Sequence, residues 1–386
     1  MKLIKYILSL ILAASLLDSC VTPFEPVGHE GAENILVIEG DINANGVTEV
    51  YLSRSQKLKD ANKRSFLSGA IVWIESEKGT KYFANQTVTG KEVSYRTPSL
   101  NLDRTLKYKL CVSLQGGHLY ESQLVPVLTS PPIKSIGFER DTVKKSVTFN
   151  VSTEDPLNST KYYKWTYTED WEFSSHIYTT YIYNPATFSI DELNYDKNIY
   201  YCWNKGSSTS ILIASTTHLS SDKVEKMPLV SMGSTDDRIS ILYSIEVTQR
   251  AITQEAYQYW DNLKKNSDKV GGLFSPQPSE MMGNIKCISD PTQVVLGYIS
   301  AGVTVSKRFF ASHSEMKTYS YYHNCAIVEP ETQSPPTAWS SLYQEGYMVA
   351  DYDLGQRKTK WAIAYCVDCR FRGTKNKPSF WPNDHK

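Results

Sequence analysis

The sequence predicts a mainly β protein built from tandem β-sandwich domains. From Ile35 onwards, short apolar runs alternate with polar residues and turn residues, which is typical of half-buried strands. Tyrosine is frequent, with 26 residues, and 8 tryptophans accompany it; aromatic side chains pack well on pleated sheets. Only one segment, at about 253–266, has a clear helical spacing of apolar residues.

Residues 1–19 resemble a secretory signal peptide. Lysines precede an apolar run that is too short to span about 30 Å of hydrocarbon as a helix. Ser19 and Cys20 resemble the end of a bacterial lipobox, in which the cysteine takes the lipid, although Asp18 departs from the usual pattern. We expect lipidation of Cys20, which would hold the mature chain on a membrane. A plain signal peptide with an incidental cysteine is the alternative.

The rest of the chain divides at clusters of turn residues. Residues 20–34 contain prolines, glycines and glutamates with little to bury, which predicts a lipidated tether. Residues 35–130 have the strand spacing of an N-terminal sandwich of the immunoglobulin or transthyretin type. Pro131 and its neighbour Pro132 end it, because consecutive prolines cannot continue a central strand. Residues 133–386 then form a larger, β-rich C-terminal domain.

The inserted helix belongs to this C-terminal domain. Residues 239–247 have the clearest period-two pattern in the chain, which predicts a long strand with one solvated face. The period then changes, because Ala256, Tyr259 and Leu263 follow a helical spacing. Thr253 is a suitable N-cap for this helix, and a Gly-Gly pair is expected to end it.

Composition and motifs argue against several classes of function. Lysine plus arginine equals aspartate plus glutamate at 41 each, so no overall charge favours nucleic acid. The chain contains no Gly-x-Ser-x-Gly elbow, no His-Glu-x-x-His pair and no Gly-Lys-Ser/Thr phosphate loop. We therefore expect no catalytic residues, no metal, no cofactor and no enzymatic activity.

The strongest local motif is Cys366-x-x-Cys369. The chain has seven cysteines, and export would place those beyond the leader in an oxidising compartment. We expect a disulfide between one member of this pair and another cysteine. One alternative is that the motif binds zinc together with Cys325 and His323. The other is that it forms a redox-active pair. The candidate disulfide residues are Cys202, Cys287, Cys325, Cys366 and Cys369.

Aromatic residues are densest between Tyr162 and Trp203. If the protein has a partner or ligand surface, we expect it here, because tyrosine and tryptophan are enriched at interfaces. The strict alternation from Tyr163 to Tyr167 instead predicts that at least half of these residues pack between sheets. The candidate surface residues are Trp171, Tyr178, Tyr181 and Tyr183.

Several longer stretches together resemble one known family. They are residues 211–217, Glu255-Ala256-Tyr257, residues 272–279, Gly283-Asn284-Ile285, Lys307-Arg308 and Phe380-Trp381. With the closing cysteine pair, this pattern is similar to a family of Bacteroidota lipoproteins catalogued as domain of unknown function 4249. The resemblance covers nearly the whole mature chain and implies no established activity and no catalytic residues. It implies that the gene lies near that of a TonB-dependent outer-membrane transporter.

These features lead us to expect a lipid-anchored accessory or binding protein of the outer membrane. We expect it to work with a TonB-dependent transporter in nutrient capture, at the cell surface rather than the periplasmic face. A secreted hydrolase acting on glycans is one alternative, because aromatic residues and scattered carboxylates could suit glycans. A structural cell-surface protein is the other.

Overall fold

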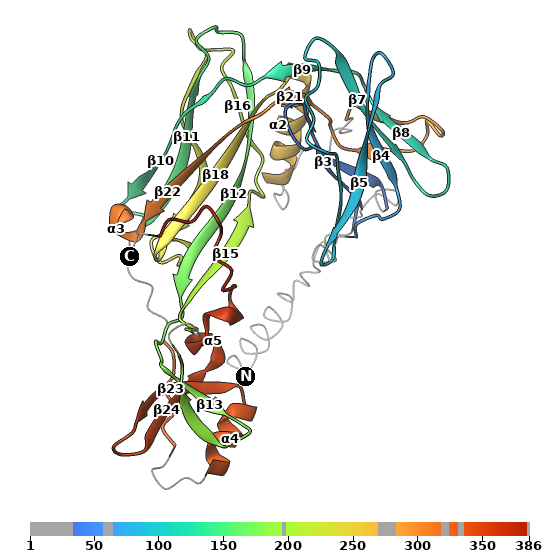
Figure 1. Cartoon of the computed structure of the whole chain (residues 1–386). Helices are drawn as coiled ribbons and strands as arrows, with labels where there is room; N and C mark the ends of the chain where they lie inside the picture. Colours follow the sequence, from blue (N-terminus) through green and yellow to red (C-terminus); the bar gives the residue numbers. More distant parts are fainter. Residues whose placement is uncertain are drawn as a thin grey trace, which may run out of the picture.

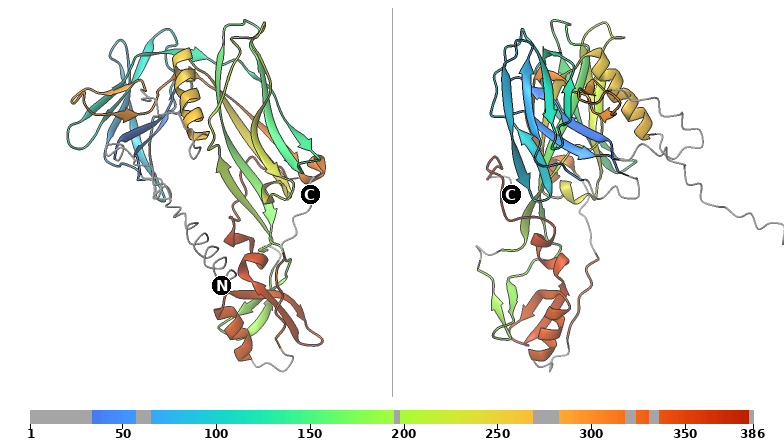
Figure 2. Two further views of the ribbon diagram at one scale, coloured as in Figure 1. Left: turned by 180° about the vertical axis from the view of Figure 1, so that it is seen from behind. Right: turned by 90° about the vertical axis from the view of Figure 1, so that its right-hand side faces the viewer.

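The structure is a computed structural model that describes residues 34–56, 65–194, 198–268, 283–317, 324–330 and 336–383. It has three parts, which we call the N-terminal domain, the central sandwich and the distal lobe (Figure 1). The N-terminal domain lies beside the sandwich, and the lobe extends from one end of the sandwich (Figure 2). The predicted signal peptide, Cys20 and the tether up to residue 33 lie outside the described residues.

The N-terminal domain is a single curled sheet, which has 12 strands among the described residues. Its strands before residue 130 are β1 (Leu36–Gly40), β2 (Ile42–Asn43), β3 (Glu49–Arg54), β4 (Ile71–Ser76), β5 (Lys81–Thr89), β6 (Glu92–Arg96), β7 (Lys107–Ser113), β8 (Leu119–Ser122) and β9 (Val125–Thr129). Alternate residues of β7 point inward, so Tyr108, Leu110 and Val112 are buried in the core as the period-two pattern predicts.

The predicted domain boundary at residue 130 is wrong in one respect. A later segment returns to this sheet and adds the strands β19 (Ile285–Cys287), β20 (Val295–Leu296) and β21 (Ala301–Val303). β20 pairs parallel with β1, and β21 lies parallel between β2 and β9. Ile285 and Ile299 of this segment are buried in the same core as Tyr108. The N-terminal domain is therefore completed by residues from the second half of the chain.

The central sandwich packs a three-stranded sheet against a five-stranded one. The first sheet consists of β10 (Ile133–Asp141), β11 (Ser146–Glu154) and β17 (Lys223–Gly233). The second consists of β12 (Tyr162–Ser174), β15 (Tyr201–Ser207), β16 (Leu212–Ser215), β18 (Leu242–Ala251) and β22 (Val305–Ser312). The short helices η4 (Asp237–Ile239) and α3 (His313–Met316) adjoin β18 and β22.

Alternation along the central strands explains the core of the sandwich. Tyr163 and Trp165 of β12 and Ile245 of β18 are buried between the sheets. The rings of Phe149 and Tyr243, one from each sheet, lie 4.6 Å apart. Much apolar and aromatic surface is thus removed from water here, which is the main stabilising contribution to a sandwich.

The expected helix is α2 (Gln254–Asp268), which lies between the sandwich and the N-terminal domain (Figure 1). The hydroxyl of Thr253 accepts a hydrogen bond from Ala256 N at 3.2 Å, as an N-cap does. Ala256 is buried against Ile213 and Ile252, and Trp260 packs at the edge of this cluster. Of the helices in the described residues, none combines the length and the apolar character needed to cross a membrane.

The distal lobe combines two hairpins with short helices. Its elements are β13 (Tyr181–Asn184), β14 (Ser189–Glu192), α4 (Pro336–Gln344), β23 (Tyr347–Asp353), β24 (Lys358–Ile363), α5 (Ala364–Val367) and η5 (Cys369–Phe371). Trp361 and Val349 form its core with Tyr183. The prediction of a single inserted helix missed α4, although Trp339 and Leu342 have a helical spacing and pack on this core.

Candidate binding pocket between the N-terminal domain and the central sandwich

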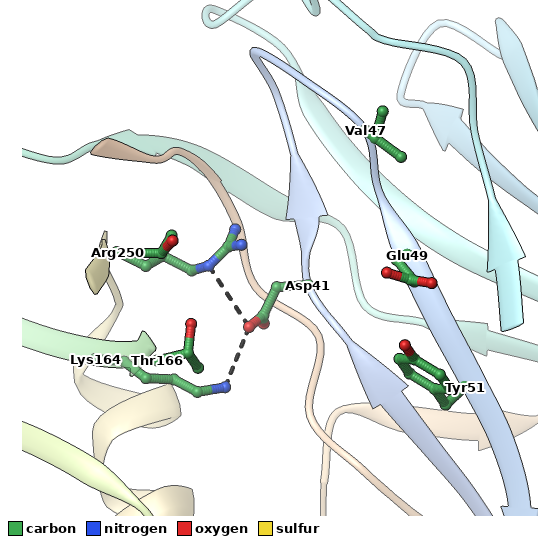
Figure 3. A pocket seen from close by; sticks show the side chains of 8 residues that line it. Asp41, Val47, Glu49, Tyr51, Lys164, Thr166 and Arg250 are labelled. Carbon is green, nitrogen blue, oxygen red and sulfur yellow. Dashed lines mark hydrogen bonds and ion pairs between the residues drawn. The ribbon is translucent and has the colours of Figure 1, made fainter. Parts of the chain in front are cut away.

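A cavity of about 370 Å³ lies where the N-terminal domain meets the central sandwich (Figure 3). One wall comes from β3 and the junction of β1 with β2, and the other comes from β12 and β18. Eight residues line it: Asp41, Val47, Glu49, Tyr51, Lys164, Thr166, Thr248 and Arg250. Pockets between domains are common sites of ligand binding, so this cavity is the candidate functional site.

The sandwich wall is the solvated face of the five-stranded sheet. β12 and β18 are antiparallel neighbours, with Lys164 opposite Arg250 and Thr166 opposite Thr248. The intervening residues, such as Trp165, face the core. Because side chains alternate along a strand, the same pattern that fills the core places two cations and two hydroxyls side by side on the pocket wall.

Asp41 reaches the pocket from the sharp junction between β1 and β2. Gly40 precedes it with φ at +149°, and a Cβ there would lie 2.6 Å from the carbonyl oxygen of Glu49. Only glycine therefore permits this close approach of β1 to β3. Beyond the junction, Ile42 N donates to the carbonyl of Ser300 at 2.8 Å, which holds β2 against the returning segment. These backbone contacts direct Asp41 toward the sandwich.

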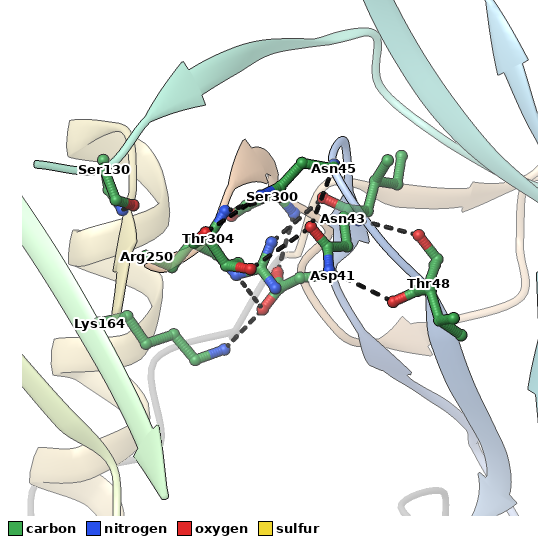
Figure 4. A network of polar contacts seen from close by, with 12 residues as sticks. Asp41, Asn43, Asn45, Thr48, Ser130, Lys164, Arg250, Ser300 and Thr304 are labelled. Carbon is green, nitrogen blue, oxygen red and sulfur yellow. Dashed lines mark hydrogen bonds and ion pairs between the residues drawn. The ribbon is translucent and has the colours of Figure 1, made fainter. Parts of the chain in front are cut away.

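The Asp41 carboxylate is shared between two cations (Figure 4). Its Oδ2 lies 3.1 Å from Lys164 Nζ and 3.5 Å from Arg250 Nε, and its Oδ1 accepts from Ser300 N at 3.1 Å. All three charged side chains are at most 15% exposed. Burial alone would raise the pKa of Asp41, but the two cations and the hydrogen bonds lower it below its usual value. Asp41 is therefore ionised at neutral pH.

Lys164 is held by an aromatic ring as well as by Asp41. Its Nζ lies 3.7 Å from the ring centre of Trp260 on α2, which is a cation–π contact. Burial, together with the nearby charge of Arg250, lowers the pKa of Lys164, and Asp41 opposes this shift. Two cations thus share a single buried carboxylate, which leaves the cluster with surplus positive charge.

The opposite wall is acidic and hydroxylated. Glu49 lies 3.7 Å from Arg96 Nε and shares the pocket wall with Tyr51, two residues along β3. Burial and the charge of Glu49 raise the pKa of Tyr51 to about 12, so its hydroxyl keeps its proton. Val47 is the one apolar lining residue and is 38% exposed. The pocket is therefore polar on both sides.

Backbone and amide contacts fix the two domains around the pocket (Figure 4). Asn45 and Thr304 exchange two hydrogen bonds, at 3.0 and 3.3 Å, between the N-terminal domain and the start of β22. Arg250 Nη1 donates to the carbonyl of Ile42 at 3.1 Å, and Ala251 N donates to Ser130 Oγ at 2.8 Å. These contacts bring the walls together without a ligand, so the pocket is preformed.

The lining offers charged groups and hydroxyls that a polar ligand could meet. Among the described residues, no group of three or more histidine, cysteine, aspartate or glutamate side chains could hold a metal ion. The lining has no histidine or cysteine, and its hydroxyl groups belong to threonine and tyrosine. Charged and hydroxyl groups that converge in this way can fix the orientation of a polar ligand.

A second hollow, of about 530 Å³, lies on the distal lobe along β23 and β24. Its charged residues are Glu329, Asp351, Asp353, Lys358 and Lys360. The ion pair between Lys360 and Asp351 spans 3.7 Å, and both side chains are about half exposed. Exposed ion pairs are weak and screened by salt. The inter-domain pocket, with buried charges, is the better candidate.

The structure does not bring the predicted aromatic surface residues together. Trp171 lies on β12 and packs between two clusters of the sandwich. Tyr183 is buried against Trp361, and Tyr181 packs in the same lobe core. Of the four, only Tyr178 is well exposed, at 57%. The four residues therefore do not form one exposed aromatic surface, because three of them pack against core clusters.

Both cysteines of the Cys366-x-x-Cys369 motif are in disulfides. Cys369 is bonded to Cys202 on β15, and Cys366 is bonded to Cys325. The disulfide interpretation is confirmed. The zinc and redox alternatives are contradicted, because both sulfurs of the motif are already bonded to other cysteines. The other proposed zinc ligand, His323, lies outside the described residues. Cys287 is a buried free thiol, so its inclusion among the disulfide candidates was wrong.

Sequence reasoning missed the three charged residues at the centre of the pocket. Asp41, Lys164 and Arg250 come from three distant parts of the chain, and in its local sequence each looks like an ordinary solvated residue. The available signal was the alternation that places Lys164 and Arg250 on the polar faces of β12 and β18. Nothing in the local sequence indicates which domain covers those faces.

Comparison with known proteins gives structural matches of low identity and low TM-score. No curated protein matches the chain. Similar solved structures include a pullulanase from Anoxybacillus sp. LM18-11, with 12% identity, a TM-score of 0.16, and coverage of 54% of this chain and 24% of that one. Another is a DUF4785 family protein from Legionella pneumophila, with 11% identity, a TM-score of 0.18, and coverage of 55% and 51% respectively. This chain thus spans less than two thirds of either protein.

A family model gives the more extensive match. It aligns with residues 21–308, a range that contains the N-terminal domain, its returning segment and both walls of the pocket. The part of the distal lobe from α4 onwards lies outside the matched region, together with Cys325, Cys366 and Cys369, whereas the hairpin of β13 and β14 and Cys202 lie within it. Because the match covers most of the 386 residues, the chain belongs to the family described as Domain of unknown function (DUF4249).

Proposed function

We propose that this protein is a lipid-anchored binding protein of the bacterial outer membrane that assists a TonB-dependent transporter in nutrient capture. The observation that carries the binding role is the preformed pocket in which Asp41, Lys164 and Arg250 are buried together. The lipobox-like sequence ending at Cys20 supports the anchor, and the family resemblance supports the transporter. The glutamates that follow Cys20 support the cell-surface location.

A role without catalysis is part of this proposal. Asp41 and Glu49 both line the pocket, and a glycan hydrolase also uses two carboxyl groups. In such a pair one carboxyl group must keep a proton at neutral pH in order to act as the acid. Asp41 is unsuited to that task, because two cations lower its pKa and hold it ionised. It is also unsuited to be the ionised partner, because Lys164 and Arg250 engage its Oδ2 and Ser300 N donates to its Oδ1. Binding is therefore the function that the lining residues support best.

Membrane fractionation tests the anchor. The wild-type protein should sediment with the outer membrane, and Cys20→Ala should move to the soluble fraction because a chain without lipid loses its attachment. Cys111→Ala is the matched control, since it removes a buried free thiol far from the leader. If Cys20→Ala stays with the membrane to the same extent as the control, the proposed anchor is wrong.

Co-purification tests the partner. The protein, tagged after Lys386, is extracted from gently solubilised outer membrane, and mass spectrometry identifies the proteins that elute with it. A TonB-dependent transporter in stoichiometric amount is the expected result. Elution of the protein alone would remove the transporter from the proposal and leave the binding role to be tested with ligands. Release of reducing sugar from glycans would instead favour the hydrolase.

A further inference from the structure

We infer that the inter-domain pocket binds a small carboxylate whose far end carries hydrogen-bond donors, such as an amino acid or a sugar acid. This inference rests on the proposed binding function and names the chemical class of the ligand. It comes from the different chemistry of the two pocket walls, which are lined by Lys164, Thr166, Thr248 and Arg250 on one side and by Val47, Glu49 and Tyr51 on the other.

The sandwich wall favours an anion because its charges do not balance. Lys164 and Arg250 both pair with the carboxylate of Asp41. Lys164 Nζ and Arg250 Nε lie 3.1 and 3.5 Å from Asp41 Oδ2. The two cations are 15% and 14% exposed, so water screens the surplus positive charge only partly. A second anion placed between them would neutralise the cluster. A neutral ligand would leave the imbalance in place.

Donors on this wall remain available for a carboxylate. The Nε and Nη1 atoms of Arg250 contact Asp41 and the carbonyl of Ile42, while its Nη2 has no hydrogen-bond partner within the described parts of the chain. Thr166 is exposed on the adjacent strand with its hydroxyl at the pocket. Guanidinium groups are well suited to carboxylates, because their donors match the spacing of the two oxygens.

The opposite wall selects the far end of the ligand. Glu49 supplies acceptor oxygens there, and the raised pKa of Tyr51 keeps its hydroxyl protonated beside them. A hydroxyl or ammonium group can donate to Glu49, whereas a second anionic group would be repelled. This wall therefore disfavours dianions such as sulfate and favours a monocarboxylate with donors at its other end.

Size restricts the ligand further. The cavity of about 370 Å³ lies near the lower end of the range of about 300–1,000 Å³ found for small-molecule sites. A single amino acid or one sugar acid is compatible with this volume, and a long oligosaccharide is not. Because both walls are fixed by inter-domain hydrogen bonds, the ligand need not order the pocket on binding.

Titration calorimetry of the purified full chain, with matched pairs of probes, tests this inference. D-glucuronate is compared with D-glucose, and L-alanine with L-alaninamide, because the members of each pair differ in the carboxylate. We expect binding of at least one carboxylate and at least tenfold weaker binding of the partner that lacks the carboxylate, with sulfate also weak. The pair that responds distinguishes a sugar acid from an amino acid. Equal binding within both pairs, or no binding by either carboxylate, would overturn the inference.

Variants then locate the site. Arg250→Gln should weaken the responding carboxylate at least about tenfold, since a charge-assisted hydrogen bond is lost. Thr166→Val, at an exposed position where folding is not at risk, should weaken it about threefold or more. Lys134→Gln is the control, because it removes an exposed cation paired with Glu154 on the other sheet. If the control weakens binding as much as both pocket variants, the ligand lies elsewhere.

Failure of this test is distinguishable from failure of the proposed function. The anchor and the transporter are tested by fractionation and co-purification, which do not depend on the ligand. If Cys20→Ala is released and the transporter co-purifies, but no carboxylate binds, the proposed function stands and the ligand class is wrong. If carboxylates bind but the anchor test fails, the pocket assignment survives alone.

Discussion

The indole Nε1 of Trp381 donates a hydrogen bond to Glu172 Oε2 at 3.1 Å, across 209 residues of sequence. Glu172 is fully buried on β12, and Trp381 is 4% exposed. The Trp381 ring also meets Phe310 of β22 edge-on at 5.7 Å. The end of the described chain is thereby fixed to the outer face of the five-stranded sheet, close to α3 (Figure 1).

Removal of this tryptophan should destabilise the sandwich. Trp381→Ala leaves a cavity and takes a donor from a buried carboxylate, so we expect the free energy of unfolding in urea to fall by about 3–5 kcal/mol. Trp381→Phe should cost less, because it retains much of the packing. Phe380→Ala is the control, since that ring is 42% exposed. Equal losses for Trp381→Ala and Phe380→Ala would show that the contact with Glu172 contributes little.

The buried charges at the pocket should also affect stability. Asp41→Asn removes the one carboxylate shared by Lys164 and Arg250, so two buried cations lose their counter-charge. We expect the free energy of unfolding to decrease by about 3 kcal/mol. Glu154→Gln breaks the exposed pair with Lys134 and should cost less than about 1 kcal/mol. Urea unfolding of both variants measures the difference. If both variants lose less than about 1 kcal/mol of unfolding free energy, the buried Asp41 ion pairs contribute no more to stability than an exposed pair.

Asp155 should make stability depend on pH in acid. Burial alone would raise its pKa, but hydrogen bonds from Ser159, Thr160 and Leu157 lower it to about 2. A carboxyl group whose pKa is lower in the folded state stabilises the fold above its unfolded pKa, near 3.8, and this contribution is lost as pH falls towards 2. Allowing for screening, we expect Asp155→Asn to cost about 1–2 kcal/mol at pH 7 and almost nothing at pH 2. A difference that does not change with pH would contradict this assignment.

The strands of the sandwich were predictable because their periodicity is local. Alternation along β12 and β18 identifies Tyr163, Trp165 and Ile245 as core residues without reference to the rest of the chain. By contrast, β20 and β21 have two and three residues, which is too short for a periodic signal. They join the N-terminal domain through parallel pairing with distant strands, and sequence spacing does not reveal such partners.

The pocket was less predictable than the fold for the same physical reason. Lys164 and Arg250 could be assigned to polar strand faces, but the residue that covers them, Asp41, depends on how two domains pack. The aromatic residues illustrate two signals in conflict. Their density between Tyr162 and Trp203 indicated a surface, while the alternation from Tyr163 to Tyr167 indicated a core. The structure follows the alternation, since burying a large ring contributes more free energy than exposing it.

The unpaired thiols should be protected in the folded protein. Cys111 and Cys287 are buried and free, and burial raises the pKa of Cys111 to about 12, so little thiolate forms at neutral pH. A chain beginning at Val21 should show almost no reaction with a thiol reagent until it is unfolded, after which two thiols react. More than two reactive thiols in the unreduced, unfolded chain would mean that a disulfide is missing.

The bond between Cys202 and Cys369 should hold the distal lobe on the sandwich. It closes 167 residues of sequence, compared with 41 for the bond between Cys325 and Cys366. The double variant Cys202→Ser/Cys369→Ser should lose about 2–5 kcal/mol of stability, because a long loop is no longer closed in the unfolded chain. Limited proteolysis should then cut the lobe first and leave the sandwich intact. The variant lacking Cys325 and Cys366 is the matched control, and faster cleavage of the sandwich than of the lobe would contradict this role.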